Sequence, residues 1–199
     1  MKNLKICVCG GTNPATDKQF LESMDEIAKL FCQNNVHLIW GGNVHGVLAV
    51  IYREYVNWNN TASNQPTHTL ITPEVYKNDL IGMDTDKVII TKTIGGRTDK
   101  MFQLADYIIF VPGGIGTAYE FWTALEEKRA GAHNAEIIIY NYNNFFKYQI
   151  KHINFINQYG FTKTGKGGAS YKVPPSKLFT VVKNVRELKS VLFQESLAN

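Results

Sequence analysis

Residues 107–120 read YIIFV followed at once by PGGIGTAYE. The first five residues are apolar and β-branched or aromatic, as in a buried strand, and the stretch from Ile115 to Arg129 is typical of a helix. Glycines between them let the backbone turn without a side chain in the way, so several N–H groups can converge on one anion at the helix start. This strand, turn and helix therefore indicate an α/β fold with a phosphate-sized site. Thr117 adds a hydroxyl to that site, and Glu120 places a carboxylate beside it.

Short apolar runs alternate with amphipathic stretches from one end of the chain to the other. This alternation predicts an α/β fold, a three-layer, doubly wound (Rossmann-like) and mainly parallel sheet of about seven strands. The predicted strands are Leu4 to Cys9, Val36 to Trp40, Thr67 to Ile71, Lys87 to Thr91, Tyr107 to Val111, Glu136 to Tyr140 and Phe179 to Val182. The predicted helices are Asp17 to Asn34, His45 to Val56, Arg97 to Leu104, Ile115 to Arg129, Asn144 to Gln158 and Val185 to Phe193. Loops are expected at Asn57 to Pro66 and Tyr159 to Lys177, and no linker divides the chain, so residues 1–199 are predicted to form a single nucleotide-binding domain.

Four glycine pairs each come after a predicted strand. They are Gly10-Gly11, Gly41-Gly42, Gly95-Gly96 and Gly113-Gly114. In a doubly wound sheet the carboxyl ends of the strands share one edge, where ligands bind, so these pairs are expected to converge on one crevice for a nucleotide or sugar phosphate. The plainer reading is that glycine pairs simply end strands. The GxGxxG spacing of dinucleotide sites and a Walker motif are both absent, which disfavours NAD.

Composition narrows the class of ligand. A formal net charge of +4 on 199 residues, without long lysine or arginine runs, suits a small anion better than a nucleic acid polymer. No apolar run approaches membrane-spanning length and the start lacks a signal-peptide pattern, so a cytoplasmic protein is expected, with no membrane partner. The cysteines and histidines show no metal-ligand spacing. No metal and no cofactor are therefore expected, and Cys7 and Cys9, on one face of a strand, are predicted to be buried core thiols.

The segment from Pro112 to Glu120 matches PGGxGTxxE, the signature of the LOG family of cytokinin-activating nucleoside 5'-monophosphate phosphoribohydrolases, long labelled lysine decarboxylases. The resemblance extends to Arg97, which stands fifteen residues before Pro112, and to Met101 and Asp106. Three further stretches resemble the family's pattern, ICVCGGT at 6–12, WGGNVHGVLA at 40–49 and residues 140–161. The chain departs from that pattern at Thr98 (usually Lys), Tyr119 (usually Glu), Asn43 and Ala49 (both usually Gly), and at Trp40 (usually Tyr), which leaves the identity of the base open.

The resemblance implies a catalytic pair, Arg97 and Glu120, and hydrolysis of the N-glycosidic bond of AMP or an N6-modified relative without a cofactor. It also implies a homodimer, for which the residues Phe121, Trp122, Phe145, Phe146, Tyr148 and Phe155 offer interface or core surface. Phosphate and substrate binding is expected of Gly113, Gly114, Gly116 and Thr117, supported by Gly10, Gly11, Thr12, Gly41 and Gly42. Asp99, Asp106 and His45 are secondary candidates for the site. An alternative is a nucleotide or pterin-cofactor (molybdenum cofactor) carrier, because fold does not fix function. Lysine decarboxylation is disfavoured, since no lysine lies in an evident pyridoxal site.

Overall fold

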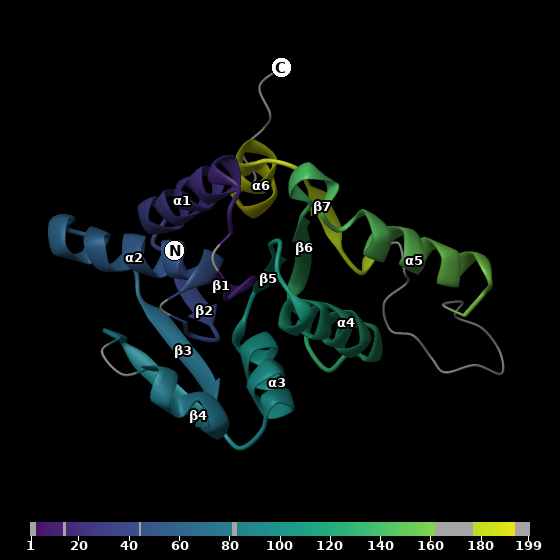
Figure 1. Ribbon diagram of the computed structural model, residues 1–199, viewed down its shortest axis with the longest axis horizontal. Helices are drawn as coiled ribbons and strands as arrows, with labels where there is room; N and C mark the ends of the chain where they lie inside the picture. Colours follow the sequence, from purple (N-terminus) through teal and green to yellow (C-terminus); the bar gives the residue numbers. More distant parts are fainter. Residues whose placement is uncertain (1–2, 14, 44, 81–82, 162–176, 194–199) are drawn as a thin grey trace.

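A computed structural model of the protein describes residues 3–13, 15–43, 45–80, 83–161 and 177–193 (Figure 1). Seven strands form one sheet in the order β4-β3-β2-β1-β5-β6-β7, and every pair of neighbours is parallel. The strands are β1 (Lys5–Cys9), β2 (His37–Trp40), β3 (His68–Pro73), β4 (Lys87–Thr91), β5 (Tyr107–Phe110), β6 (Glu136–Tyr140) and β7 (Thr180–Val182). The predicted α/β fold and all seven predicted strands are confirmed.

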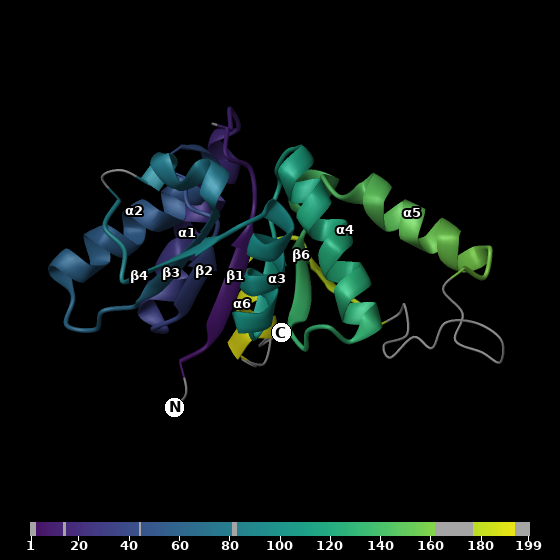
Figure 2. The ribbon, with the colours of Figure 1, turned by 90° about the horizontal axis from the view of Figure 1, so that it is seen from below.

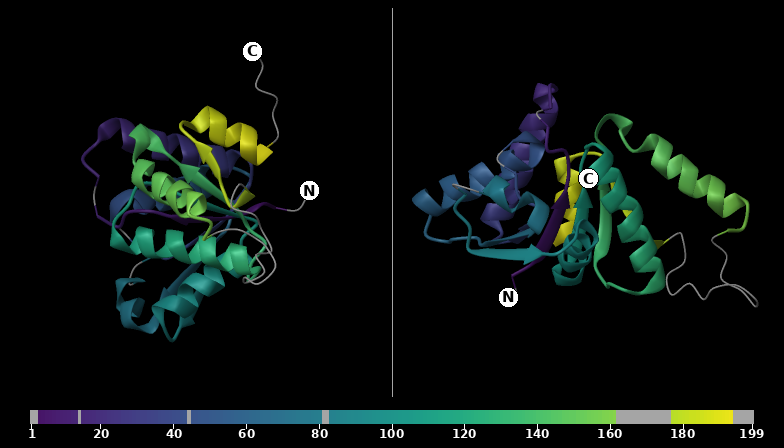
Figure 3. Two further views of the ribbon diagram at one scale, coloured as in Figure 1. Left: turned by 90° about the vertical axis from the view of Figure 1, so that its right-hand side faces the viewer. Right: turned by 60° about the horizontal axis from the view of Figure 1, so that its bottom comes forward.

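Six helices and two short 3-10 helices connect the strands within the described residues. They are α1 (Lys18–Gln33), α2 (Gly46–Thr61), η1 (Glu74–Leu80), α3 (Ile94–Leu104), α4 (Ile115–Ala130), η2 (Tyr142–Asn144), α5 (Lys147–Gln158) and α6 (Val185–Phe193). Figure 1 shows α1, α2 and α6 on one side of the sheet and α3 and α4 on the other, and the left view of Figure 3 shows the same layering from the side. Of these helices, none is both long enough and apolar enough to span a membrane.

The strands β1, β2, β3, β5 and β6 are largely buried on both faces, whereas the edge strands β4 and β7 are largely exposed. The side chains of the buried strands alternate between two hydrophobic cores. In β1, Ile6 and Val8 belong to the core under α1, α2 and α6, whereas Cys7 and Cys9 belong to the core under α3 and α4. Period-two alternation in a strand produces this division. It carries a consequence for the site, because Cys9 faces the same side of the sheet as the helices that bear Arg97 and Glu120.

The strand order reverses between β1 and β5, the two strands at the centre of the sheet. From β1 the chain winds outward through β2 and β3 to β4, then crosses back by α3 to β5, and from there it winds outward to β6 and β7. Figure 2 shows α3 and α4 side by side on the face of the sheet opposite α1, α2 and α6. Loops diverge at such a reversal and leave a crevice at the carboxyl ends of the strands.

Helix boundaries differ from the prediction by more than one residue in three places. Helix α3 begins at Ile94, not at Arg97, because the Thr93 hydroxyl caps it by accepting a 3.0 Å hydrogen bond from Gly96 N. Gly95-Gly96 therefore lies in the first helical turn and not in a loop.

The other two differences concern asparagine-rich segments. Helix α2 runs on to Thr61 through the predicted loop, because Trp58 packs against the core and its indole N–H donates to Asn64 Oδ1 at 3.1 Å. Helix α5 begins at Lys147 and not at Asn144, since Asn143 and Asn144 have φ of 47° and 59°, a left-handed backbone that no α-helix continues. Most of the predicted loop after Tyr159 lies outside the described residues.

Candidate active site

A cavity of about 1200 Å³ opens at the carboxyl ends of the central strands. Its lining comes from the loops after β1, β2, β5 and β6, from η1, and from the first turns of α1 to α4. All eleven residues proposed for the site from the sequence line it: Gly10, Gly11, Thr12, Gly41, Gly42, Arg97, Gly113, Gly114, Gly116, Thr117 and Glu120. The structure thus brings these residues together, while their roles in binding and catalysis stay predictions.

The floor of the cavity is a close backbone contact between the loops after β1 and β5. Gly11 N donates to Pro112 O at 3.2 Å, and a Cβ added at Gly113 would overlap Thr117 Oγ1 and lie 2.6 Å from Gly11 N. The two loops can approach this closely because no side chain lies between them. Gly113 is therefore required by packing, whatever binds above it.

Gly114 and Gly116 have the opposite surroundings. A Cβ added at either residue would meet no atom within 4 Å, so both face open space in the cavity. Gly114 is the N-cap of α4 and its position carries no side-chain capping hydrogen bond. The first turn of α4 therefore begins beside open space and without a side-chain cap, and uncapped N–H groups at a helix start can bind phosphate.

In each of the other helices that begin at the cavity, one N–H group of the first turn has a hydrogen-bond partner outside the helix. The side chain of Asp17 caps α1, that of Thr93 caps α3, and in α2 the N–H of Val47 donates to Gly11 O at 3.0 Å. Among the helices that begin at the cavity, α4 is thus the one whose first turn lacks such a partner in the described part of the chain. This comparison favours the start of α4 over the other helix starts as the candidate anion site.

Arg97 and Glu120 form an ion pair inside the cavity. Arg97 Nη2 lies 2.7 Å from Glu120 Oε1, and the two side chains are 15% and 9% exposed. The pair joins the first turn of α3 to the second turn of α4, one helical turn beyond the open N–H groups. A carboxylate and a guanidinium are therefore held next to the place where a phosphate would bind.

Burial raises the pKa of the Glu120 carboxyl above its usual value, while the Arg97 charge and a hydrogen bond with the Cys9 thiol act in the opposite direction. The described lining contains one cation, Arg97, and two acids, Glu120 and Asp17. Since Arg97 is already paired, a phosphate in this cavity would depend on N–H and hydroxyl donors and on the α4 dipole more than on cationic side chains.

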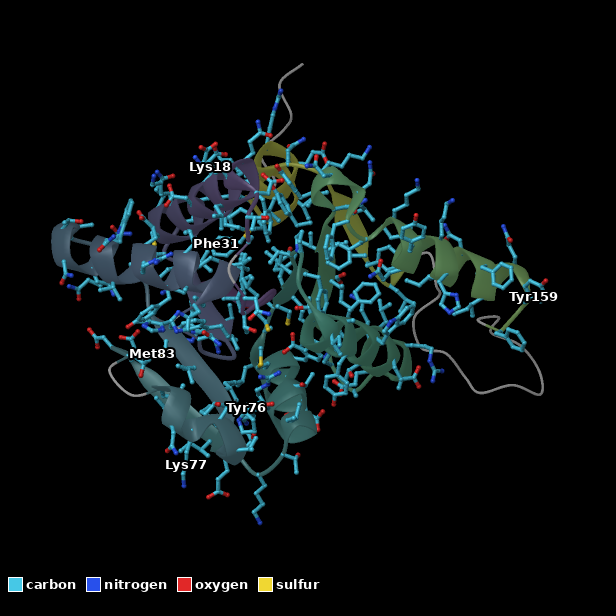
Figure 4. The ribbon with its side chains drawn as sticks, viewed as in Figure 1. Lys18, Phe31, Tyr76, Lys77, Met83 and Tyr159 are labelled. Atoms are coloured by element: carbon cyan, nitrogen blue, oxygen red, sulfur yellow. The ribbon has the colours of Figure 1, made fainter. Side chains whose placement is uncertain are left out.

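The rim of the cavity is apolar and aromatic. Its exposed members are Tyr76, Ile94, Ile115, Tyr119 and Phe145. Figure 4 shows Tyr76 on the side of η1 that is nearer to α3, and the rim therefore combines segments far apart in the sequence. None of these residues was predicted from the sequence as a site residue. Ile115 and Tyr119 lie in the PGGxGTxxE segment, whereas no local pattern indicates Tyr76, Ile94 or Phe145.

Several secondary candidates lie elsewhere. Thr98 is fully buried and its hydroxyl donates to Ile94 O, so this departure from the family pattern does not line the cavity. Asp106 accepts a hydrogen bond from Lys5 N at 2.9 Å, a structural role at the amino ends of β1 and β5, away from the cavity. Asp99 is exposed and contacts Glu127. His45, the N-cap of α2, is exposed and is not among the lining residues.

The described residues contain no group of three or more His, Cys, Asp or Glu side chains arranged to hold a metal ion. Cys7 and Cys9 are buried, as predicted, and so is Cys32. Cys9 is also part of the cavity wall, which the sequence reading missed. Its place as the last strand residue before Gly10 was the available signal.

Comparisons with known proteins were made for the sequence and for the fold. A family profile described as "Possible lysine decarboxylase" matches residues 41–177. The cytokinin riboside 5'-monophosphate phosphoribohydrolase LOG2 of Arabidopsis thaliana is 22% identical over 162 residues, which cover 80% of this chain and 73% of that protein. The cytokinin riboside 5'-monophosphate phosphoribohydrolase of Mycobacterium tuberculosis is 27% identical over 127 residues, 62% of this chain and 64% of that protein.

Solved structures with the same fold include two proteins named for the molybdenum cofactor. The molybdenum cofactor carrier protein of Chlamydomonas reinhardtii superposes with a TM-score of 0.66 at 18% identity, covering 97% of this chain and 98% of that chain. The molybdenum cofactor binding protein of Rippkaea orientalis gives a TM-score of 0.64 at 14% identity and covers 98% of both chains. At this identity the likeness shows a shared fold. The family profile spans well over half of the chain. The chain therefore belongs to the LOG family, whose profile carries the description "Possible lysine decarboxylase".

Proposed function

We propose that the protein hydrolyses the N-glycosidic bond of a purine nucleoside 5'-monophosphate, AMP or an N6-modified relative, to give free base and ribose 5-phosphate. The observation that carries the proposal is the buried Arg97–Glu120 pair, 2.7 Å between Nη2 and Oε1, beside the open first turn of α4. The names of the similar phosphoribohydrolases support the reaction class.

The chemistry follows from the charge that develops at the sugar. Cleavage of an N-glycosidic bond passes through an oxocarbenium-like state at C1' of the ribose, which a nearby carboxylate stabilises. With the phosphate on the first turn of α4, the ribose would reach towards the second turn, where Glu120 lies. We assign Glu120 the roles of stabilising C1' and of orienting or deprotonating the attacking water.

Arg97 has a different role in this proposal. A guanidinium is a poor acid at neutral pH, so it assists by positioning the substrate and by stabilising negative charge on the departing base. Its charge also lowers the pKa of the Glu120 carboxyl, against the larger raising effect of burial. One of its five N–H donors goes to Glu120, and its Nε–H is buried without a hydrogen-bond partner among the described residues.

Product analysis tests the proposal directly. The protein is incubated with AMP and with isopentenyladenosine monophosphate, and the free base and ribose 5-phosphate are measured. We expect both products in equal amounts from at least one substrate and none from the corresponding nucleoside without phosphate. If no nucleoside monophosphate releases its base, the hydrolase proposal is wrong.

A second candidate, a carrier of a nucleotide or pterin cofactor, is favoured by the size of the cavity. At about 1200 Å³ it exceeds the usual range of small-ligand pockets, roughly 300–1,000 Å³, and two structures with this fold are named as molybdenum cofactor proteins. A carrier needs the phosphate site but not the Glu120 carboxylate. Tight retention of ligand without product, unchanged in Glu120→Gln, would support the carrier and exclude the hydrolase.

We also propose that the protein is a homodimer, as the resemblance implies. Phe121 and Phe146 are core residues, but Trp122, Phe145, Tyr148 and Phe155 are exposed on α4, α5 and the turn before α5. Figure 4 shows Tyr159 at the far end of α5, a helix with one buried residue, Ile153, along its length. Aromatic residues are enriched in interfaces, so Tyr148→Glu combined with Phe155→Glu should convert a dimer to a monomer in light scattering.

A further inference from the structure

The Cys9 thiol lies at the meeting point of the sheet and the proposed catalytic pair. Cys9 is the last residue of β1, it is 1% exposed, and it lines the same cavity as Arg97 and Glu120. Its thiol lowers the pKa of the Glu120 carboxyl as a hydrogen-bond partner, and its sulfur lies 3.8 Å from the sulfur of Cys7 on the same face of the strand, where either thiol could donate to the other. The hydrolase argument above makes no use of this thiol.

We propose that Cys9 is a positioning residue for Glu120: its S–H donates to the carboxylate, so that Arg97 and Cys9 together fix the orientation of the group that faces the ribose. This inference rests on the hydrolase function proposed above and extends it to a residue outside the PGGxGTxxE segment. Cys9 itself is not assigned a contact with the substrate.

Two features of the carboxylate make a second donor useful. The terminal torsion of a glutamate is broad, and a carboxylate offers about four acceptor positions, so the single bond from Arg97 to Oε1 leaves the plane of the group poorly fixed. A donor from β1 holds the carboxylate from the sheet, a more rigid element than either helix start.

A thiol also suits the charge balance of the site. Burial, followed by the neighbouring Cys7 and the charge of Glu120, raises the pKa of Cys9 well above its usual value, so the group is an uncharged S–H at neutral pH. An uncharged donor orients the carboxylate without neutralising it. A second cation in this position would weaken the negative charge that must face C1'.

The titratable and charged side chains near Glu120 come from several elements. Arg97 faces it from α3, and Cys9 faces it from β1 with Cys7 behind. The other titratable groups of the described cavity lining are Asp17 before α1, Tyr76 in η1, Tyr119 in α4 and Tyr142 in η2. Asp17 is engaged as the cap of α1, where it accepts from Phe20 N.

The test compares Cys9→Ala with Cys9→Ser and uses Cys7→Ala as the matched control. Cys7 is as buried as Cys9 and lies on the same strand face, but it does not line the cavity. The carboxyl titration of Glu120 is followed by ¹³C NMR in protein labelled at glutamate side chains, with Glu120→Gln to assign the signal. The pH profile of AMP hydrolysis is measured in parallel.

We expect Cys9→Ala to raise the pKa of Glu120 by about half a unit to one unit and to lower kcat about tenfold, because a donor to the ionised form is lost. Cys9→Ser, which keeps a donor, should restore most of both values, and Cys7→Ala should leave both unchanged. A purely packing role for Cys9 would lower the melting temperature in both alanine variants without moving the titration.

The inference is overturned if Cys9→Ala leaves the Glu120 titration where it is in the native protein, or if Cys7→Ala shifts it equally. Failure of the hydrolase proposal is seen separately, as absence of base release by the native protein. The NMR titration does not depend on turnover, so it still decides whether Cys9 controls the carboxylate.

Discussion

The guanidinium of Arg97 lies against the backbone of Gly41, because a Cβ added at Gly41 would be 3.3 Å from Arg97 Nη1 and 3.7 Å from its Cζ. The guanidinium of Arg97 therefore contacts the loop after β2 near Nη1 and pairs with Glu120 through Nη2. This contact explains why a glycine at 41 suits the site although its own backbone does not need one, since its φ is not positive.

Gly41→Ala should displace the guanidinium by a few tenths of an ångström and lower kcat/KM for AMP about tenfold, because small misplacements of catalytic groups are costly. The melting temperature should change little, since the added methyl group meets only the end of a flexible side chain. Steady-state kinetics and thermal unfolding check the two halves of this prediction. A variant with native kinetics would show that the position of Arg97 is not critical.

Substitutions in the proposed catalytic pair should reduce turnover more than they reduce substrate binding. Glu120→Gln and Arg97→Ala are each expected to reduce kcat by on the order of a hundredfold or more, if both act in the transition state. Glu120→Gln retains the shape of the side chain, so AMP should still bind, as measured by calorimetry on this inactive variant. Exposed Glu22 of α1 provides the control, because Glu22→Gln should change neither binding nor turnover.

Gly113 and Gly114 are adjacent, yet their substitutions should fail in different ways. Gly113→Ala should lower the melting temperature by several degrees, because its methyl group would lie 2.6 Å from the backbone N of Gly11 and the two loops would have to separate. Gly114→Ala should fold with a native melting temperature, since a Cβ there meets nothing.

Gly114→Ala should nevertheless weaken binding of phosphate-bearing ligands, because the methyl group would occupy the open space at the first turn of α4. The affinities of this variant for AMP and for adenosine are measured, because a loss specific to the phosphate should weaken binding of AMP and leave binding of adenosine unchanged. Equal affinity of the variant and the native protein for AMP would place the phosphate elsewhere in the cavity.

The pH dependence of turnover should reflect Glu120. Burial raises the pKa of its carboxyl above the usual value, against the lowering effects of Arg97 and Cys9, and the proposed role requires the ionised form. Activity is therefore expected to fall as the pH decreases through a pKa above 4.5, the ordinary value for this side chain. The profile of kcat is the appropriate measurement, because kcat/KM also reports the second ionisation of the substrate phosphate, near pH 6.

The sequence was sufficient for the fold and for the central residues of the cavity, because both depend on local patterns. Apolar runs of four to six residues, glycine pairs and the spacing of Arg97 from Pro112 are visible in one dimension. The rim was not predictable, because Tyr76 and Phe145 reach the cavity only through the packing of η1 and the turn before α5. The start of α3 was misplaced because the glycines at 95 and 96 outweighed the capping signal of Thr93 in the prediction.

The contact between Glu127 and Asp99 links α3 and α4, the helices that carry the proposed catalytic pair. Partial burial, together with the hydrogen bond and the charge of Asp99, raises the pKa of Glu127 to about 7. A carboxyl whose pKa is higher in the folded protein stabilises the fold below its ordinary pKa of 4.5, and this contribution is lost as the pH rises through about 7. Glu127→Gln keeps the neutral hydrogen-bonded form at every pH. Its melting temperature should therefore match that of the native protein near pH 4.5 and exceed it increasingly up to pH 8.

Asp99→Asn removes the same repulsion from the other side and should produce a similar gain, whereas Glu22→Gln should track the native protein throughout. Melting temperatures at half-unit intervals of pH measure the effect, and a constant difference between Glu127→Gln and the native protein would contradict it. Because the helices α3 and α4 also carry Arg97 and Glu120, the same series measured for turnover shows whether the contact keeps these two side chains paired. If it does, kcat of the native protein above pH 7 should fall relative to Glu127→Gln.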